Sequence, residues 1–270
     1  MKEFQLIREI QRLSSGAAGE SGFGVELGIG DDAAVLEIPT GCRLVAATDT
    51  LNAGTHFPLD TSPFDIGFKA LAVNLSDLAA MGAVPHWALL SLSLPDADPE
   101  WVRSFITGLM SLAKPHGVTL VGGDTTSGPM SISLTALGSI QPGLHMPRSG
   151  AEPGDLLVVS GALGGAAYVL DLLKKGKKAS APELLNRPQP RVELGQFLAS
   201  YANACIDISD GLLADLGHIL RASGCAARLD IGKLPEPGCF ADLPAATKWE
   251  YQLSGGDDYE LLFTLPHSYM

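Results

Sequence analysis

The acidic residues of this 270-residue chain carry its strongest chemical signal. Five segments place Asp beside Gly, Ser or Thr where a strand or turn is predicted to end. They are Asp31-Asp32, Thr48-Asp49, Gly123-Asp124, Asp207-Ile208-Ser209-Asp210 and Gly256-Asp257-Asp258. Loops beyond strand ends often hold ligand sites, and carboxylates gathered there raise one another's pKa unless a cation neutralises them. Because the ligand atoms are oxygens, the pattern favours a hard divalent ion, Mg²⁺ first, acting with phosphate groups.

Asp77 adds a sixth acid in a different setting. The segment 69–86 reads as an apolar helix with a Gly-Ala-Val-Pro exit, and Asp77 shares one face of it with Asn74. A carboxylate in such surroundings is costly unless something pairs with it, and the spacing of Lys69 places that side chain elsewhere. A bound cation fits best. The alternative for Asp77 is a hydrogen bond to a neighbouring loop, and for the other acids a simple turn role.

Two glycine-rich segments match the letters of nucleotide-binding loops without their context. Residues 28–33 fit GxGxxA, but a strand is predicted next instead of a helix, which excludes a Rossmann site. Residues 161–165 lie between a strand and a helix but lack the GxGxxG spacing, which argues against a dinucleotide site there. The sequence also contains no GxxxxGK[ST], so a P-loop is excluded.

Composition excludes several classes of protein. The formal net charge of −12 argues against a nucleic-acid-binding surface. No apolar run reaches the length of a membrane span, and the N-terminus lacks the apolar core of a signal peptide, so we expect a cytoplasmic protein without a membrane partner. Cys42, Cys205, Cys225 and Cys239 form no CxxC pair and are interpreted as reduced thiols.

The elements that must position the acids alternate between strands and helices, which favours an α/β or α+β fold. We expect strands at 43–48, 87–94, 118–121, 131–140, 156–160, 204–206, 226–231 and 261–265. We expect helices near 4–13, within 69–86, and at 99–114, 166–173 and 212–222, with Asp98 as the N-cap of the third. We expect loops at 16–24 and 234–246. The Pro- and Gly-rich stretch 141–154 predicts a boundary between domains 1–140 and 141–270.

Seven segments, taken together, resemble the thiamine-monophosphate kinase family. They are GIGDDAAVL, ATDTLNAGTHF, KALAVNLSDLAAMGA, GGDTT, RSGAEPGD, DISDGLLADLGHI and SGGDDYELLF, in this order across nearly the whole chain. The resemblance implies a two-domain fold like that of aminoimidazole ribonucleotide synthetase. It would have an N-terminal mixed sheet with helices that dimerises, and a C-terminal α/β sandwich. It also implies transfer of the ATP γ-phosphoryl group to thiamine monophosphate, giving thiamine diphosphate.

The resemblance further implies roles for individual residues. The Mg²⁺ ligands would be Asp32, Thr48, Asp49, Asp77, Asp124, Asp207 and Asp210. ATP would contact Gly123, Asp124, Arg148 and Ser209, and thiamine monophosphate would face His56 and Asp257. Several Mg²⁺ ions would bridge the two anionic substrates, and no catalytic side chain is implied because phosphoryl transfer needs mainly positioning and charge neutralisation. The implied partners are ATP, thiamine monophosphate and a second copy of the chain.

Three features depart from the family pattern. Ala47 stands where the family often has a hydroxyl residue, and Asp257 stands where it more often has Glu. Family chains continue by several dozen residues beyond the position of Met270, so we expect missing C-terminal residues. Two rival hypotheses remain: an ATP-dependent enzyme of the same superfamily with a different acceptor, and a non-catalytic acidic metal-binding or scaffold protein.

Overall fold

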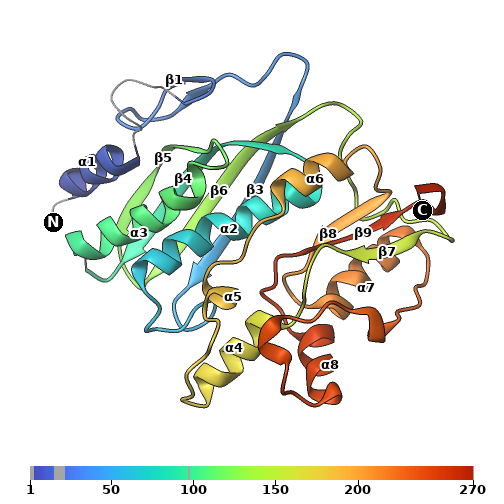
Figure 1. Ribbon diagram of the computed structural model, residues 1–270. Helices are drawn as coiled ribbons and strands as arrows, with labels where there is room; N and C mark the ends of the chain where they lie inside the picture. Colours follow the sequence, from blue (N-terminus) through green and yellow to red (C-terminus); the bar gives the residue numbers. More distant parts are fainter. Residues whose placement is uncertain (1–2, 15–21, 97, 270) are drawn as a thin grey trace. The chain divides into compact units, whose positions relative to one another are not determined.

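The structure is a computed structural model that describes residues 3–14, 22–96 and 98–269. The chain separates into two compact units (Figure 1). The first comprises residues 1–78 and 84–142, and the second comprises residues 79–83 and 143–270. Most of the loop expected at 16–24 lies outside the described residues. Within the described residues, no helix is long and apolar enough to cross a membrane.

A four-stranded mixed sheet is the centre of the first unit. Its order is β3–β6–β4–β5, with β4 and β5 parallel and the other pairs antiparallel. The strands are β3 (Arg43–Asn52), β4 (Val84–Leu94), β5 (Thr119–Ser127) and β6 (Ser131–Ile140). Helices α2 (Pro63–Met81) and α3 (Pro99–Ala113) run side by side across one face of this sheet (Figure 1).

Glycine permits the close contact between α2 and α3. A Cβ atom added to Gly108 would lie 1.9 Å from the carbonyl oxygen of Phe64, and one added to Gly67 would lie 2.0 Å from that of Phe105. Any side chain at either glycine would therefore push the helices apart. Asp98 caps α3 as predicted, because its Oδ1 accepts the Glu100 N–H at 3.0 Å.

The N-terminal elements cover part of the sheet. They are α1 (Glu3–Ser14) and a two-stranded ribbon of β1 (Val25–Leu27) and β2 (Val35–Leu36). The indole N–H of Trp87 on β4 donates to the carbonyl of Phe23 at 2.7 Å. Because β2 and not a helix follows the GxGxxA letters, the rejection of a Rossmann site is confirmed.

The second unit contains a three-stranded antiparallel sheet of order β7–β9–β8. The strands are β7 (Leu156–Val159), β8 (Ala204–Asp207) and β9 (Leu261–Leu265). The helices are α4 (Gly165–Lys174), α5 (Glu183–Asn186), α6 (Val192–Leu198), α7 (Leu212–Ser223) and α8 (Ala245–Ser254). Short 3₁₀ turns occupy Ile231–Lys233, Gly238–Phe240 and His267–Tyr269. Ile206, Leu216 and Leu262 belong to the core between sheet and helices.

One expectation for the second unit is wrong, and three helices were not predicted. Residues 226–231 form no strand; positions 226–228 are exposed, and Leu229 alone of this segment packs on the core as described. Helices α5, α6 and α8 were not predicted, and the Pro-rich loop expected at 234–246 overlaps only the first two residues of α8. Pro244 in fact occupies the N-cap of α8, where a missing N–H carries no cost.

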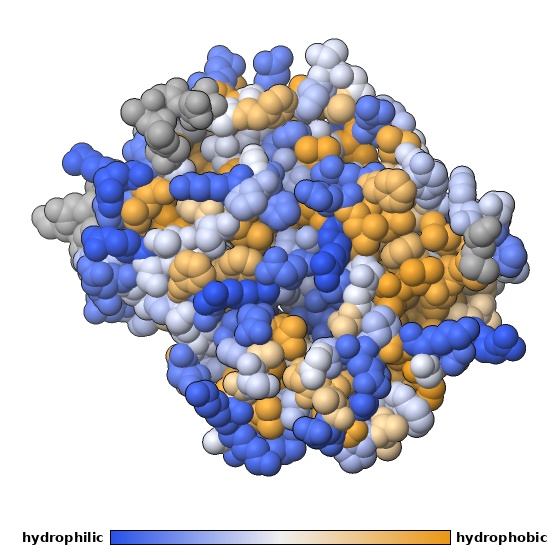
Figure 2. Space-filling model, viewed as in Figure 1, coloured by the Kyte–Doolittle hydropathy of each residue, from blue (hydrophilic) through white to orange (hydrophobic). Residues whose placement is uncertain are grey.

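Surface hydrophobic residues in this unit include an aromatic group. Phe197, Tyr201 and Tyr269 are exposed, with ring centroids 4.9 and 5.4 Å apart in consecutive pairs. On the face viewed in Figure 2, hydrophobic side chains gather over the region of β7, β8 and β9, while hydrophilic side chains cover most of the rest.

Candidate active site

Asp49 and Asp77 meet in the first unit although they lie on different elements, β3 and α2. Their carboxyl groups lie close enough to interact directly. A hydrogen bond between them would need one proton on the pair, because two ionised carboxylates have no donor. Burial raises the pKa of the Asp49 carboxyl above its ordinary value, and the interaction with Asp77 and the charge of His56 oppose that rise. A divalent cation would take the place of such a proton, so the pair fits a metal site.

His56 lies on the loop that follows β3, and this loop is fixed from two sides. The Asn52 N–H donates to His56 Nδ1 at 3.0 Å, which in a neutral ring leaves the proton on Nε2. The buried Lys69 Nζ donates to the His56 carbonyl at 3.2 Å. His56 itself is exposed. The arrangement offers a ring N–H, in a fixed loop, to an anion such as a phosphate oxygen.

Thr48, Asp49 and Asp124 lie inside strands, so the expectation that they sit at loop tips is wrong. Strand β3 continues to Asn52 because it pairs with β6 along its whole length. Strand β5 likewise continues to Ser127 because it pairs with β4, with Asp124 opposite Ser91. The hydrogen bonds between these strands pair backbone N–H and C=O groups that would be exposed to water in a loop.

The sheet separates three of the predicted metal ligands. Successive residues of a strand point to opposite faces, so the Thr48 side chain lies on the face opposite that of Asp49; its hydroxyl donates to the Leu134 carbonyl at 3.1 Å. Strands β6 and β4 stand between β3 and β5. Three inter-strand spacings therefore put Asp124 roughly 14 Å from β3. Within one copy of the chain, Asp49 and Asp124 therefore lie on strands that are not neighbours in the sheet.

Gly123 and Asp32 occupy special backbone positions in the same unit. Gly123 has φ 151°, and a Cβ atom there would lie 1.8 Å from the Leu90 carbonyl oxygen, so only glycine fits beside Asp124. Asp32 is exposed in the turn between β1 and β2, next to Asp31, as the glycine-rich sequence predicted.

The second unit brings together four other predicted residues. Asp207 ends β8 and is buried, and Ser209 and Asp210 follow it on the loop before α7. The segment containing Asp257 pairs with this loop, because the Asp257 N–H donates to the Ser209 carbonyl at 2.9 Å. Asp257 has φ 67°, uncommon for a residue with a side chain, and its Oδ1 accepts the Tyr259 hydroxyl at 3.1 Å. Ser209, a predicted nucleotide residue, and Asp257, a predicted acceptor residue, are thus neighbours.

Arg148 is placed apart from that group within the second unit. Its carbonyl accepts the hydroxyl of Ser223, the last residue of α7, at 3.0 Å. The loop of Ser209 precedes the first residue of the same helix. The twelve residues of α7 span roughly 18 Å, so the Arg148 backbone and Ser209 lie at opposite ends of the helix.

Two acids near this site have roles that the sequence did not predict: Asp215, which is buried and was not singled out, and Asp258, which is half-buried and was predicted only as part of the Gly256-Asp257-Asp258 segment. Asp215, in the first turn of α7, accepts three backbone N–H groups of the Ser209 loop. Burial raises the pKa of its carboxyl above the ordinary value, and the N–H groups oppose that rise. The sequence did contain a signal for Asp215. It is a charged residue one turn after Asp207-Ile208-Ser209-Asp210, and it lies between the apolar Leu212 and Leu216.

Asp258 is the second of these acids. Its Oδ2 accepts the Gly164 N–H at 2.8 Å, so it caps the N-terminus of α4. The glycine-rich loop 161–165 is therefore occupied by a carboxylate of the protein itself, in agreement with the argument against a dinucleotide there. Burial raises the pKa of Asp258 to about 7, and nearby Glu260 and Asp257 add to the rise.

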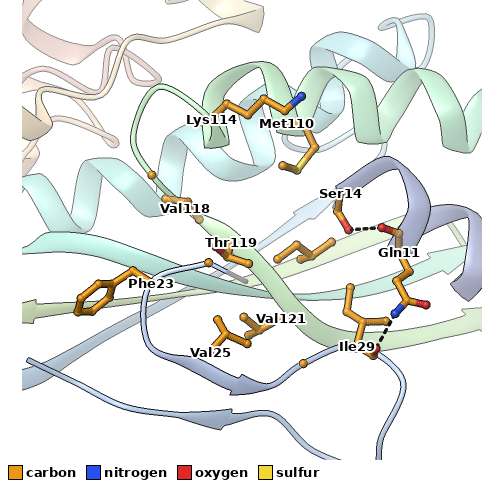
Figure 3. Close-up of a pocket in the computed structure, with 14 residues that line it drawn as sticks. Gln11, Ser14, Phe23, Val25, Ile29, Met110, Lys114, Val118, Thr119 and Val121 are labelled. Carbon is orange, nitrogen blue, oxygen red and sulfur yellow. Dashed lines mark hydrogen bonds between the residues drawn. The ribbon is translucent and has the colours of Figure 1, made fainter. Parts of the chain in front are cut away.

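A cavity of about 550 Å³ lies elsewhere, among α1, β1, α3 and β5 of the first unit (Figure 3). Its lining includes Phe23, Val25, Met110 and Lys114, and the bond from Gln11 to the Ile29 carbonyl closes one side. Among the described residues, its lining contains no carboxylate. This cavity is therefore separate from the acidic candidate site.

Comparison with known proteins identifies the family. Residues 30–140 match the family model of the AIR synthase related protein N-terminal domain, and residues 152–266 match the C-terminal domain. Thiamine-monophosphate kinase of Salmonella typhimurium is 46% identical over 275 residues, covering 98% of this chain and 82% of the relative. The chain belongs to the thiamine-monophosphate kinase family. The Bacillus subtilis member is 36% identical, with coverage of 98% and 84%.

Solved structures of this family share the fold. Thiamine-monophosphate kinase from Stenotrophomonas maltophilia superposes with a TM-score of 0.90 at 45% identity, covering 99% of this chain and 87% of that one. A family structure described as AaThiL complexed with AMPPCP and TMP gives a TM-score of 0.80 at 36% identity, with coverage of 90% and 81%. The resemblance inferred from seven motifs is confirmed, and so is the two-domain fold of mixed helices and sheets.

Proposed function

We propose that this protein is an ATP-dependent thiamine-monophosphate kinase that converts thiamine monophosphate to thiamine diphosphate. The observation that carries the proposal is the match to a family structure that holds AMPPCP, an ATP analogue, together with TMP. The acidic residues support it, because transfer between two phosphate-bearing substrates needs their charges neutralised and their phosphates aligned.

We assign the metal role to the residues predicted from the sequence: Asp32, Thr48, Asp49, Asp77, Asp124, Asp207 and Asp210. The Asp49–Asp77 pair supports this best, since two carboxyl groups that interact this closely would be neutralised by a bound cation. When bound, Mg²⁺ would supply charge neutralisation of the phosphates. The side chains of the chain itself hold the substrates in place and need not act as nucleophiles.

We assign ATP contacts to Gly123, Asp124, Arg148 and Ser209, and acceptor contacts to His56 and Asp257. The Nε2–H of His56 is a suitable donor to a phosphate oxygen, because Asn52 already occupies Nδ1. Gly123 suits a close approach of backbone to a ligand.

We further propose that residues 1–140 form the ATP, metal and dimerisation domain and that residues 141–270 form the C-terminal domain. The sheet face that carries exposed Leu44 and Thr48 is the surface we assign to a second copy of the chain. The cytoplasm remains the predicted location.

The test is ADP release from ATP and Mg²⁺ with thiamine monophosphate, measured beside a panel of other phosphorylated acceptors. We expect thiamine diphosphate as product, and loss of at least about 100-fold in kcat for Asp77→Asn, because the amide cannot replace the charge. Asp65→Asn, on the same helix but bonded to Ser62 at its N-terminal turn, is the matched control and should stay near wild type. Turnover with another acceptor alone, or normal turnover in Asp77→Asn, would refute the assignment.

A further inference from the structure

The loop that carries Ser209 and Asp210 is wrapped around one buried oxygen atom. Asp215 Oδ2 accepts the N–H groups of Ser209, Asp210 and Gly211, each at 3.1 Å. Asp215 is 2% exposed and lies in the first turn of α7, where its own N–H donates to the Gly211 carbonyl at 3.0 Å. A single acceptor therefore fixes three successive peptide groups.

The other side of the same loop is bonded to the segment 255–259. The Asp257 N–H donates to the Ser209 carbonyl at 2.9 Å, and the Tyr259 N–H donates to the Ile208 carbonyl at 2.8 Å. A Cβ atom on Gly256 would lie 2.3 Å from the Ser209 carbonyl oxygen, so the two segments are in close contact. Displacement of the loop would therefore also displace Asp257.

The task at position 215 is to offer one oxygen acceptor to three N–H groups at once. The loop has no regular structure of its own to hold these N–H groups in line, so the acceptor atom is what aligns them. Removing the acceptor would leave three buried or half-buried N–H groups without a hydrogen bond. The loop would then shift so that these groups could bond to water.

We infer that Asp215 is a positioning residue for nucleotide binding, which sets the places of Ser209 and Asp210 through their backbone and does not itself touch the nucleotide. This inference rests on the proposed function. The rival reading is a direct metal ligand, since ligand atoms of Asp210, Asp215 and His218 lie within 4.8 Å of one another. The two readings differ in whether the charge or the acceptor atom of Asp215 matters.

The experiment compares Asp215→Asn, which keeps an oxygen acceptor but loses the charge, with Asp215→Ala, which loses both. AMPPCP affinity is measured by calorimetry at saturating Mg²⁺, and hydrogen exchange is measured on peptides covering 207–216. We expect Asp215→Ala to weaken AMPPCP binding at least about tenfold and to speed exchange at 209–211. We expect Asp215→Asn to stay within about threefold of wild type.

A matched control is Asp155→Ala in the same unit. Asp155 also accepts a backbone N–H, from Glu152 at 3.0 Å, and bonds the Asn203 side-chain amide. We expect this variant to lower the melting temperature without changing AMPPCP affinity. If Asp215→Ala does not fold, Asp215→Ser replaces it with the same expected loss.

Three results would overturn the inference. A folded Asp215→Ala that binds AMPPCP like wild type removes the positioning role. An Asp215→Asn that loses as much affinity as Asp215→Ala favours a direct charge contact instead. A wild-type protein that binds no AMPPCP overturns the proposed function and this inference with it, so the two failures are distinguishable.

Discussion

Replacing Asp258 with Asn should change how the stability of the protein depends on pH. Asp258 is a half-buried carboxyl at the N-terminus of α4, and loss of solvation there raises its pKa from the ordinary 3.8 to about 7. In the unfolded chain the carboxyl ionises at its ordinary pKa. Between the two values the folded state therefore binds more protons than the unfolded state, and the free energy of unfolding falls as the pH rises.

The size of the effect follows from the shift. A shift of about three pKa units corresponds to a loss of about 4 kcal/mol in the free energy of unfolding. This loss is zero at pH values below the pKa of the unfolded chain and complete at pH values above the pKa of the folded protein. Over the range from pH 5.5 to 7 the expected loss is about 2 kcal/mol. Asn keeps an oxygen for the Gly164 N–H but does not titrate, so Asp258→Asn should lack this decline. The new amide N–H groups of Asn must also find acceptors, which reduces the expected gain in stability by about 1 kcal/mol.

The assay is urea unfolding at intervals from pH 5.5 to 8, followed by circular dichroism. We expect Asp258→Asn to be more stable than wild type at pH 8, with the difference shrinking toward pH 5.5. Asp242→Asn, at an exposed position of the same unit, is the control and should follow the wild-type curve. Parallel curves for wild type and Asp258→Asn would refute the reasoning that links burial at this site to stability.

Two further substitutions test how the structure is held together. Arg191→Ala should lower the free energy of unfolding by about 3 kcal/mol, because it leaves the buried Glu260 carboxylate without its bidentate cation. Adding Glu260→Gln should recover part of this loss in urea unfolding, and no recovery would contradict the explanation. Gly108→Ala should cost about 2 to 4 kcal/mol, since its Cβ would lie 1.9 Å from the Phe64 carbonyl oxygen. Gly238→Ala, where no atom lies within 4 Å of the added Cβ, should change the melting temperature little; equal losses would contradict the steric account.

Local signals in the sequence were sufficient wherever the physical cause is local. Asp98 before Pro99 predicted the start of α3, because an N-cap is decided by a few neighbouring residues. The alternation in 131–140 predicted β6 with its observed bounds. Helix α8 was not predicted, although the Pro244 before it disfavours only a helix interior and not a helix start.

The extent of β3 and β5 required knowledge of their partners. Thr48 and Asp124 have turn-forming neighbours, and nothing local says that the strands continue past them. They do so because β6 and β4 offer unpaired backbone groups alongside. Pairing between strands distant in the sequence outweighs local propensity, so the acids lie within the sheet and not at its loops.

By itself the sequence determined the chemistry of this protein. It showed which acids the chain carries, that Gly, Ser and Thr stand beside them, and to which family these motifs belong. Only the tertiary structure decided which acids meet. Asp49 and Asp77 come together from β3 and α2, while Asp124 is kept apart from β3 by two strands. It also showed which N–H groups Asp215 and Asp258 accept. The role of such a carboxylate depends on these N–H groups, and only folding brings them to the carboxylate.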